Sequence, residues 1–142
     1  MKAFFSLLAA VLFGSQAFAA PPVWGTDLSK AISQAGKENK LGLILVGRES
    51  CGNCQTTKKL INEGKVGVTA ENFVVAELDS DNARVYEEFE RKFKDEKFGD
   101  ILPFVVITDS KGNPLASFSG LKSAEKITAL VEGAKSKATA TK

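Results

Sequence analysis

Two closely spaced cysteines are the residues of this sequence best suited to do chemistry. Cys51 and Cys54 are the only cysteines in the chain, and Gly52 and Asn53 separate them. They follow an apolar run at 43–46 and open a segment with helical character. If a helix begins at or just before Cys51, its unpaired N–H groups and the positive end of its dipole favour a thiolate there. We therefore expect Cys51 to be the nucleophile and Cys54, one turn further in on the same face, to be the resolving thiol.

The composition excludes several other kinds of site. The chain has no histidine, so neither Cys-His nucleophilic catalysis nor a histidine-ligated metal site is available. Two thiolates cannot complete a tetrahedral zinc site within one chain, and zinc would need a dimer or carboxylate ligands. The formal net charge is +2, with Lys and Glu interleaved, which gives no electrostatic reason to expect nucleic acid or an anionic membrane as a partner. We expect no cofactor beyond a redox-active disulfide between the two cysteines.

The first twenty residues have the pattern of a secretory signal peptide. Lys2 gives a basic start, residues 3–13 are apolar, and small residues precede the expected cleavage after Ala19 or Ala20. The apolar stretch is shorter than the roughly 20 residues that span a bilayer, so no stable membrane anchor is expected. We therefore expect an exported, periplasmic protein, with secretion as the alternative.

Helices and strands alternate along the rest of the chain. Apolar periodicity and turn residues predict helices at 28–35, 51–61, 83–97 and 123–131, and strands at 41–46, 73–78, 104–108 and 115–119. Strands separated by helices pair in parallel, and the last two strands form an antiparallel hairpin. The predicted fold is α/β, with a mixed sheet of about four strands and helices on both faces. We expect one domain at 21–135 and a flexible tail at 136–142.

Three features together resemble the thioredoxin-like superfamily. A strand leads into the Cys51 to Cys54 motif at a helix start, Pro103 stands just before a strand, and Gly120 follows the last strand. The resemblance covers roughly 23–134 and implies a three-layer sandwich. The residues around Trp24, together with those before the strands at 41 and 73, are similar to one exported branch. That branch includes the C-terminal periplasmic domain of the transmembrane reductant conductor DsbD and small single-domain relatives.

The resemblance also implies how a substrate would dock. In the family the proline before the strand is cis and lies against the disulfide, which would make Leu102-Pro103 a cis peptide bond. The exposed backbone of Leu102 would pair with an extended substrate segment, and Gly52 and Asn53 would contact the same segment. The partners would be protein thiols and disulfides, with a membrane electron donor or another redox protein regenerating the pair.

The sequence departs from the family's pattern at several positions. Thioredoxins usually have tryptophan before the first cysteine and Gly-Pro between the two, whereas this chain has Ser50 and Gly52-Asn53. The buried aspartate that assists the resolving cysteine in thioredoxins is replaced by Leu45. Glu77 matches a position often held by lysine, and burial near Cys54 would make it a proton acceptor. The alternative for Glu77 is a solvated or ion-paired glutamate at a strand end.

The function predicted from these residues is thiol-disulfide exchange with partner proteins, as a reductase in the first instance. The same residues could also oxidise or isomerise disulfides. A second hypothesis is a binding module of the same fold in which Cys51 and Cys54 form a permanent structural disulfide. Because so short a loop removes little chain entropy when it closes, the pair would be a poor staple.

Overall fold

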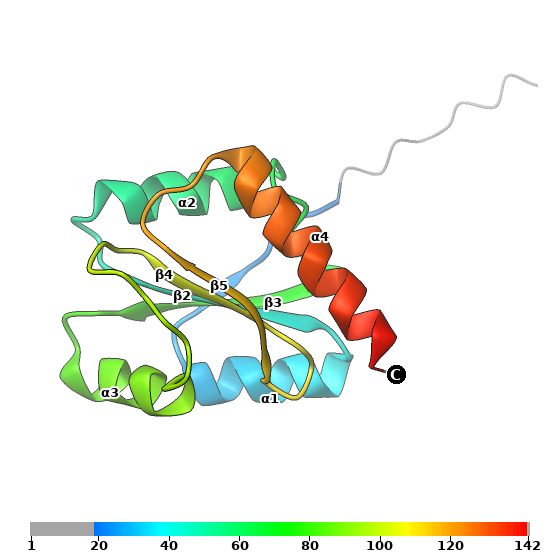
Figure 1. Cartoon of the computed structure of the whole chain (residues 1–142), viewed down its shortest axis with the longest axis horizontal. Coiled ribbons are helices and arrows are strands. Elements are labelled where there is room, and N and C mark those ends of the chain that lie inside the picture. The colour runs from blue at the N-terminus through cyan, green and yellow to red at the C-terminus, as the bar shows by residue number, and fades with distance from the viewer. Residues whose placement is uncertain (1–18, 142) are drawn as a thin grey trace, which may run out of the picture.

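The computed structural model describes residues 19–141 (Figure 1). The signal peptide predicted at 1–20 lies outside the described residues except for Ala19 and Ala20. Nine elements follow one another along the chain: β1 (Trp24–Gly25), α1 (Leu28–Glu38), β2 (Leu41–Gly47), α2 (Gly52–Asn62), β3 (Phe73–Asp79), α3 (Ala83–Lys92), β4 (Phe104–Thr108), β5 (Pro114–Ser119) and α4 (Ala124–Ala140).

The strands form one mixed sheet in the order β1-β3-β2-β4-β5. β3 pairs in parallel with both β1 and β2, whereas β4 is antiparallel to β2 and to β5. The predicted α/β class is confirmed, and the predicted count of about four strands is corrected to five. Sequence reasoning missed β1 because it has two residues, with Trp24 opposite Val75, and so shows no apolar periodicity.

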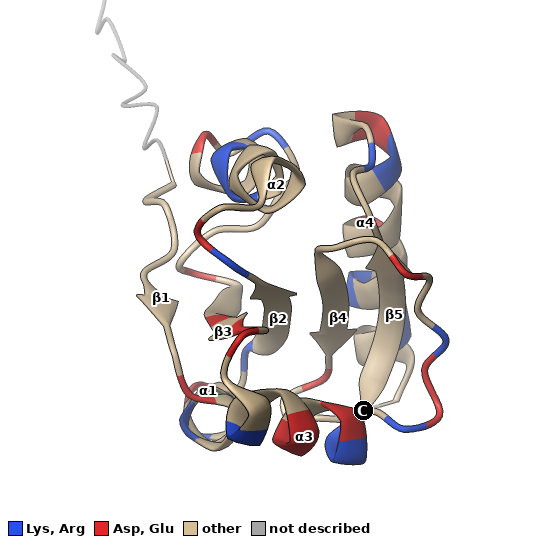
Figure 2. Cartoon of the chain, turned by 90° about the vertical axis from the view of Figure 1, so that its left-hand side faces the viewer, with Lys and Arg blue, Asp and Glu red and all other residues tan. Residues whose placement is uncertain are grey.

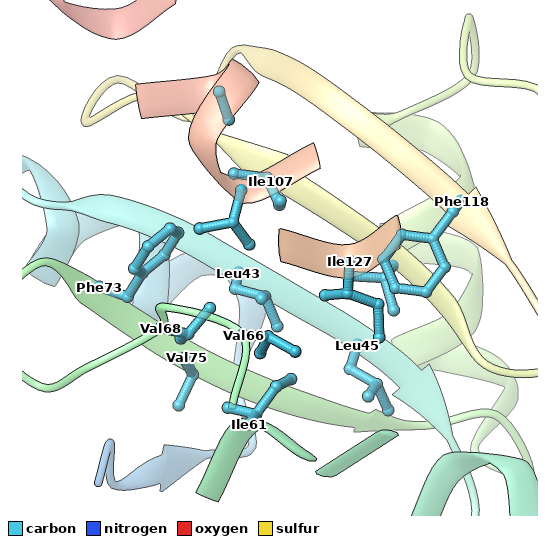
Figure 3. Packing of buried hydrophobic residues seen from close by; sticks show 13 residues of the cluster. Leu43, Leu45, Ile61, Val66, Val68, Phe73, Val75, Ile107, Phe118 and Ile127 are labelled. Carbon is cyan, nitrogen blue, oxygen red and sulfur yellow. The ribbon is translucent and has the colours of Figure 1, made fainter. Parts of the chain in front are cut away.

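Helices cover both faces of the sheet, as predicted. On one face, Leu43, Leu45 and Val75 pack with residues of α2 and α4, including Ile61 and Ile127 (Figure 3). On the other face, alternate residues of the same strands pack with residues of α1 and α3. Both helices lie on that side of the sheet (Figure 1). β2 is buried on both faces of the sheet, which explains why its sequence is continuously apolar. The helix that carries the cysteines therefore rests on a rigid central strand.

Two helix ends differ from the predictions. α3 stops at Lys92 rather than at 97, because the chain turns to bring Phe98 back against Phe89, with 5.5 Å between the ring centroids. α4 continues to Ala140, so residues 136–140 are helical where a flexible tail was expected. Lys137 Nζ anchors this extension by donating a hydrogen bond to the Leu115 carbonyl at 2.9 Å, and Ala134, just before it, is buried.

Charged residues lie on the helices and loops, and the strands carry almost none (Figure 2). Within residues 19–141, the charged residues of the sheet are Glu77 and Asp79, both near the end of β3. No helix of the described part of the chain is both long enough and apolar enough to cross a membrane.

The buried centre of β2 gives a test of the fold. We expect Leu43→Ala to lower the free energy of unfolding by about 2–5 kcal/mol, since truncation of a buried leucine removes apolar burial and leaves a cavity. Leu43 is 0% exposed, whereas Val23, the control, is 88% exposed. Val23→Ala should change stability by less than about 0.5 kcal/mol. Urea unfolding followed by circular dichroism measures both, and equal losses in the two variants would contradict the burial of Leu43 in the core.

Candidate active site

The two cysteines lie at the N-terminus of α2 and form a disulfide, with 5.3 Å between their Cα atoms. Cys51 is the N-cap residue of α2, and its sulfur accepts a hydrogen bond from the backbone N–H of Cys54 at 3.2 Å. Cys51 is partly exposed, whereas Cys54 is 0% exposed. The expected nucleophile thus lies at the surface, and the expected resolving thiol lies beneath it.

The burial of Cys54 depends on a glycine at the end of β2. A Cβ atom built on Gly47 would lie 2.8 Å from Cys54 Sγ and 3.1 Å from Leu45 Cδ2. The sulfur of Cys54 therefore packs against bare backbone and beside the side chain of Leu45. Sequence reasoning assigned no role to Gly47, although a glycine directly after an apolar strand signals that another group approaches its backbone closely.

The residues expected to dock a substrate meet at the start of α2. The peptide bond between Leu102 and Pro103 is cis. Asn53, between the cysteines, donates a hydrogen bond from its side-chain Nδ2 to the Leu102 carbonyl at 3.4 Å. Two exposed apolar side chains border this segment, Ile101 at 62% and Leu121 at 46% exposed. On this side the disulfide therefore adjoins apolar residues and the segment that leads into β4.

Glu77 forms an ion pair with Lys58 of α2, and each side chain is 21% exposed. Of the two alternatives for Glu77, this arrangement matches an ion-paired glutamate, and proton transfer to it stays a hypothesis. The ammonium group of Lys58 also lies over the ring of Trp24, 5.5 Å from its centroid. The indole Nε1 of Trp24 in turn donates to Asn62 Oδ1 at 2.8 Å. Sequence reasoning missed Lys58. The one signal for it was its spacing of four residues from Cys54, which places both side chains on one face of a helix.

A cleft of about 860 Å³ opens beside the motif, on the side of β3. Gly47, Lys58 and Glu77 line it, together with the charged residues that flank the motif and follow β3, which are Arg48, Glu49, Asp79 and Asp81. Arg48 Nη1 forms an ion pair with Asp81 Oδ1 at 3.1 Å. Over residues 19–141, no group of three or more His, Cys, Asp or Glu side chains is arranged to hold a metal ion.

The arrangement suits reversible exchange at sulfur. A partner thiolate can reach the exposed sulfur of Cys51, and the first turn of α2 offers backbone N–H groups to a negative charge there. The buried sulfur of Cys54 can be reached from Cys51 alone, so it suits an intramolecular second step.

Comparison with known proteins agrees with this geometry. Residues 28–135, more than half of the chain, match the family model described as a thioredoxin-like domain. The comparison with curated proteins found no match.

Several solved structures have the same fold. A mutant thioredoxin from Halobacterium salinarum superposes with a TM-score of 0.56 at 18% identity, covering 81% of this chain and 93% of that one. A thioredoxin-like protein from Clostridium perfringens gives a TM-score of 0.57 at 17% identity, with 86% and 89% covered. A chain of the complex between ferredoxin:thioredoxin reductase and thioredoxin f2 gives 0.59 at 15% identity, with 83% and 99% covered.

The contact between Gly47 and Cys54 can be tested with a single methyl group. We expect Gly47→Ala to lower the free energy of unfolding of the disulfide form by about 1–3 kcal/mol, because the added methyl overpacks the site. Gly133, in the interior of α4, is the matched control, since a Cβ there meets no atom within 4 Å. Gly133→Ala should instead raise stability by about 0.5–1 kcal/mol. Urea unfolding of both variants measures the difference, and a neutral Gly47→Ala would contradict the close contact.

Proposed function

The chain belongs to the family of thioredoxin-like domains, and we propose that it is an exported thiol-disulfide oxidoreductase that exchanges its Cys51-Cys54 pair with partner proteins, chiefly as a reductase. The observation that carries this proposal is the unequal exposure of the two sulfurs. Cys51 is partly exposed at a helix N-terminus, whereas Cys54 is wholly buried. A permanent structural disulfide has no need of such an arrangement, but two-step exchange requires one accessible and one protected sulfur.

The reaction proceeds through a mixed disulfide. In the reducing direction, the thiolate of Cys51 attacks one sulfur of a partner disulfide, and the other partner sulfur leaves as a thiolate. The thiolate of Cys54 then attacks Cys51 Sγ, which releases the second partner thiolate and forms the Cys51-Cys54 disulfide. Two electrons pass to the partner, whose thiolates take up protons from the solvent. Glu77 is the proposed acceptor of the Cys54 proton.

The partner segment is expected to bind as an added strand. The backbone of Leu102 lies before the cis bond to Pro103, and it offers hydrogen-bonding groups to an extended chain. Gly52 lies at the start of α2 with no atom within 4 Å of a Cβ built on it, so a partner backbone can come close. Asn53 already donates to the Leu102 carbonyl, and an incoming N–H would take its place.

The proposal also includes export of the protein and re-reduction of its cysteine pair by another protein. The pattern of residues 1–20 supports a signal peptide, and an exported reductase needs electrons from elsewhere, since glutathione and thioredoxin keep thiols reduced only inside the cell. A membrane protein that conducts electrons outward, or another exported redox protein, would supply them.

Equilibration with glutathione tests the redox role. We expect the mature protein to exchange its disulfide with glutathione redox buffers and to give a reduction potential near that of thioredoxin, about −270 mV. Thiol alkylation followed by mass measurement reports the reduced fraction. A potential near the oxidising end, about −120 mV, would instead mean a disulfide donor. If the disulfide does not exchange at all, the pair is structural and the proposed function is wrong.

Single-cysteine variants test the assignment of roles. We expect Cys54→Ser to accumulate a mixed disulfide with glutathione or a protein partner, because Cys51 attacks but nothing resolves the product. Cys51→Ser should form such adducts at least about a hundredfold more slowly, since the remaining thiol is buried. Mass spectrometry after mixing with oxidised glutathione measures both. Faster adduct formation in Cys51→Ser would reverse the two assignments.

A further inference from the structure

Lys58 is held in place by three elements of the fold. Its stem comes from α2, its ammonium group pairs with Glu77 of β3, and the ring of Trp24 in β1 lies 5.5 Å from it. The side chain is 21% exposed, which is low for a lysine. A surface lysine normally keeps its ammonium group in bulk water, so the partial burial of Lys58 is unusual and suggests a function.

The ion pair lies close to the buried sulfur. Cys54 and Lys58 are four residues apart in α2, which places their side chains on one face of the helix, with Cβ atoms about 5–6 Å apart. Helical side chains generally lean toward the N-terminus of their helix, which for Lys58 is the direction of Cys54.

The pairing of β2 with β3 also relates Glu77 to Cys54, through Leu45. Leu45 Cδ2 and Cys54 Sγ both lie within 3.1 Å of one point, the Cβ position built on Gly47. Leu45 is the register partner of Glu77 in the parallel pairing of β2 with β3, and neighbouring strands are about 4.8 Å apart. Leu45 therefore adjoins Cys54 on one side and the strand position of Glu77 on the other. Gly47, Lys58 and Glu77 also line the same cleft.

We infer that Lys58 is a positioning residue for the second step of exchange: when Cys54 ionises, the ammonium of Lys58 shifts from Glu77 toward the Cys54 thiolate and stabilises it. This inference rests on the proposed function. The Cys54 proton passes to the Glu77 carboxylate, which holds it while the thiolate exists and releases it through the cleft after the disulfide has formed. The thiolate then attacks Cys51 Sγ in the mixed disulfide, the intramolecular S–S bond forms, and the partner sulfur leaves as a thiolate. The charge in the pocket stays balanced, because the carboxylate becomes neutral as the sulfur becomes negative.

The other charged groups around the cleft are less suited to stabilise a thiolate at Cys54. Arg48 of the loop after β2 is 46% exposed and is already paired with Asp81. Glu49, Asp79 and Asp81 are exposed and carry negative charge, which opposes a thiolate rather than stabilising it. Lys58 is therefore the cation of the cleft that is both partly buried and on the helix face of Cys54.

Trp24 makes the shift observable. It is the only tryptophan in the chain, and the ammonium of Lys58 lies over its ring. Movement of that ammonium toward Cys54 changes the charge above the indole. We expect the fluorescence of Trp24 to follow the ionisation of Cys54 in the reduced protein, and to show no such transition in the disulfide form.

The test separates the two steps of exchange in rapid-mixing experiments. The reduced mature protein is mixed with an aromatic disulfide that releases one coloured thiolate when Cys51 attacks and a second when Cys54 resolves the adduct. The second release is independent of reagent concentration. We expect Lys58→Met to slow the second release about tenfold at neutral pH and to move its pH midpoint upward, since a nearby opposite charge favours the ionised thiol. The first release should change less than about twofold.

Two further variants test whether the charge of Lys58 is responsible. Lys58→Arg retains the cation and should restore the rate and the Trp24 transition. Lys59→Met is the matched control, because Lys59 is 73% exposed and lies 3.8 Å from Glu63, and it should behave as the wild type. If Lys58→Met has a wild-type second release and pH midpoint, the inference is wrong while the proposed function stands. If the wild type itself releases no second thiolate, the proposed function fails first.

Discussion

The close contact between Cys54 and the backbone of Gly47 is the constraint on which the rest of the site depends. It seats the first turn of α2 on the end of β2, with no side chain between them. That seating buries one sulfur completely and leaves the other at the helix N-terminus. A buried central strand makes the contact rigid, because apolar packing on both faces of β2 leaves it little freedom to move. The unequal exposure of the two sulfurs is thus a result of packing.

The disulfide separates two unlike surfaces. On one side lie Leu102, the cis Pro103 and the exposed side chain of Ile101, which suit an extended polypeptide. On the other side lies the charged cleft at the end of β3. A docked partner would cover the first surface and leave the second open to water. In the proposed mechanism, a partner protein can therefore bind on one side of the disulfide while the proton leaves through the cleft on the other side.

The order of the four helices and of β2 to β5, together with the cysteine pair, could be predicted from the sequence, because apolar periodicity and the motif's spacing are local signals. β1 could not, since its two residues acquire strand structure by pairing with Val75 and Ala76 of β3. The helical end of α4 was missed because its Lys, Ala and Thr residues resemble a tail, while its anchor, a hydrogen bond to the Leu115 carbonyl, joins distant residues. Lys58 was missed for a similar reason, since both Trp24 and Glu77 lie far from it in the sequence.

The apolar side chain of Leu45 helps to explain where the charges of the site lie. Leu45 is 0% exposed and belongs to the larger apolar cluster, so a carboxylate there would be costly to ionise without a partner. Glu77 and Lys58 are each 21% exposed at the edge of the cleft, where water reduces the cost of holding two charges. A partly hydrated pair is also easier to rearrange than a fully buried one, because solvent can replace a contact that breaks. With the ionisable groups on β3 and α2 and none on β2, the core beneath Cys54 stays apolar, and in the proposed mechanism the charge of Lys58 can shift toward the sulfur.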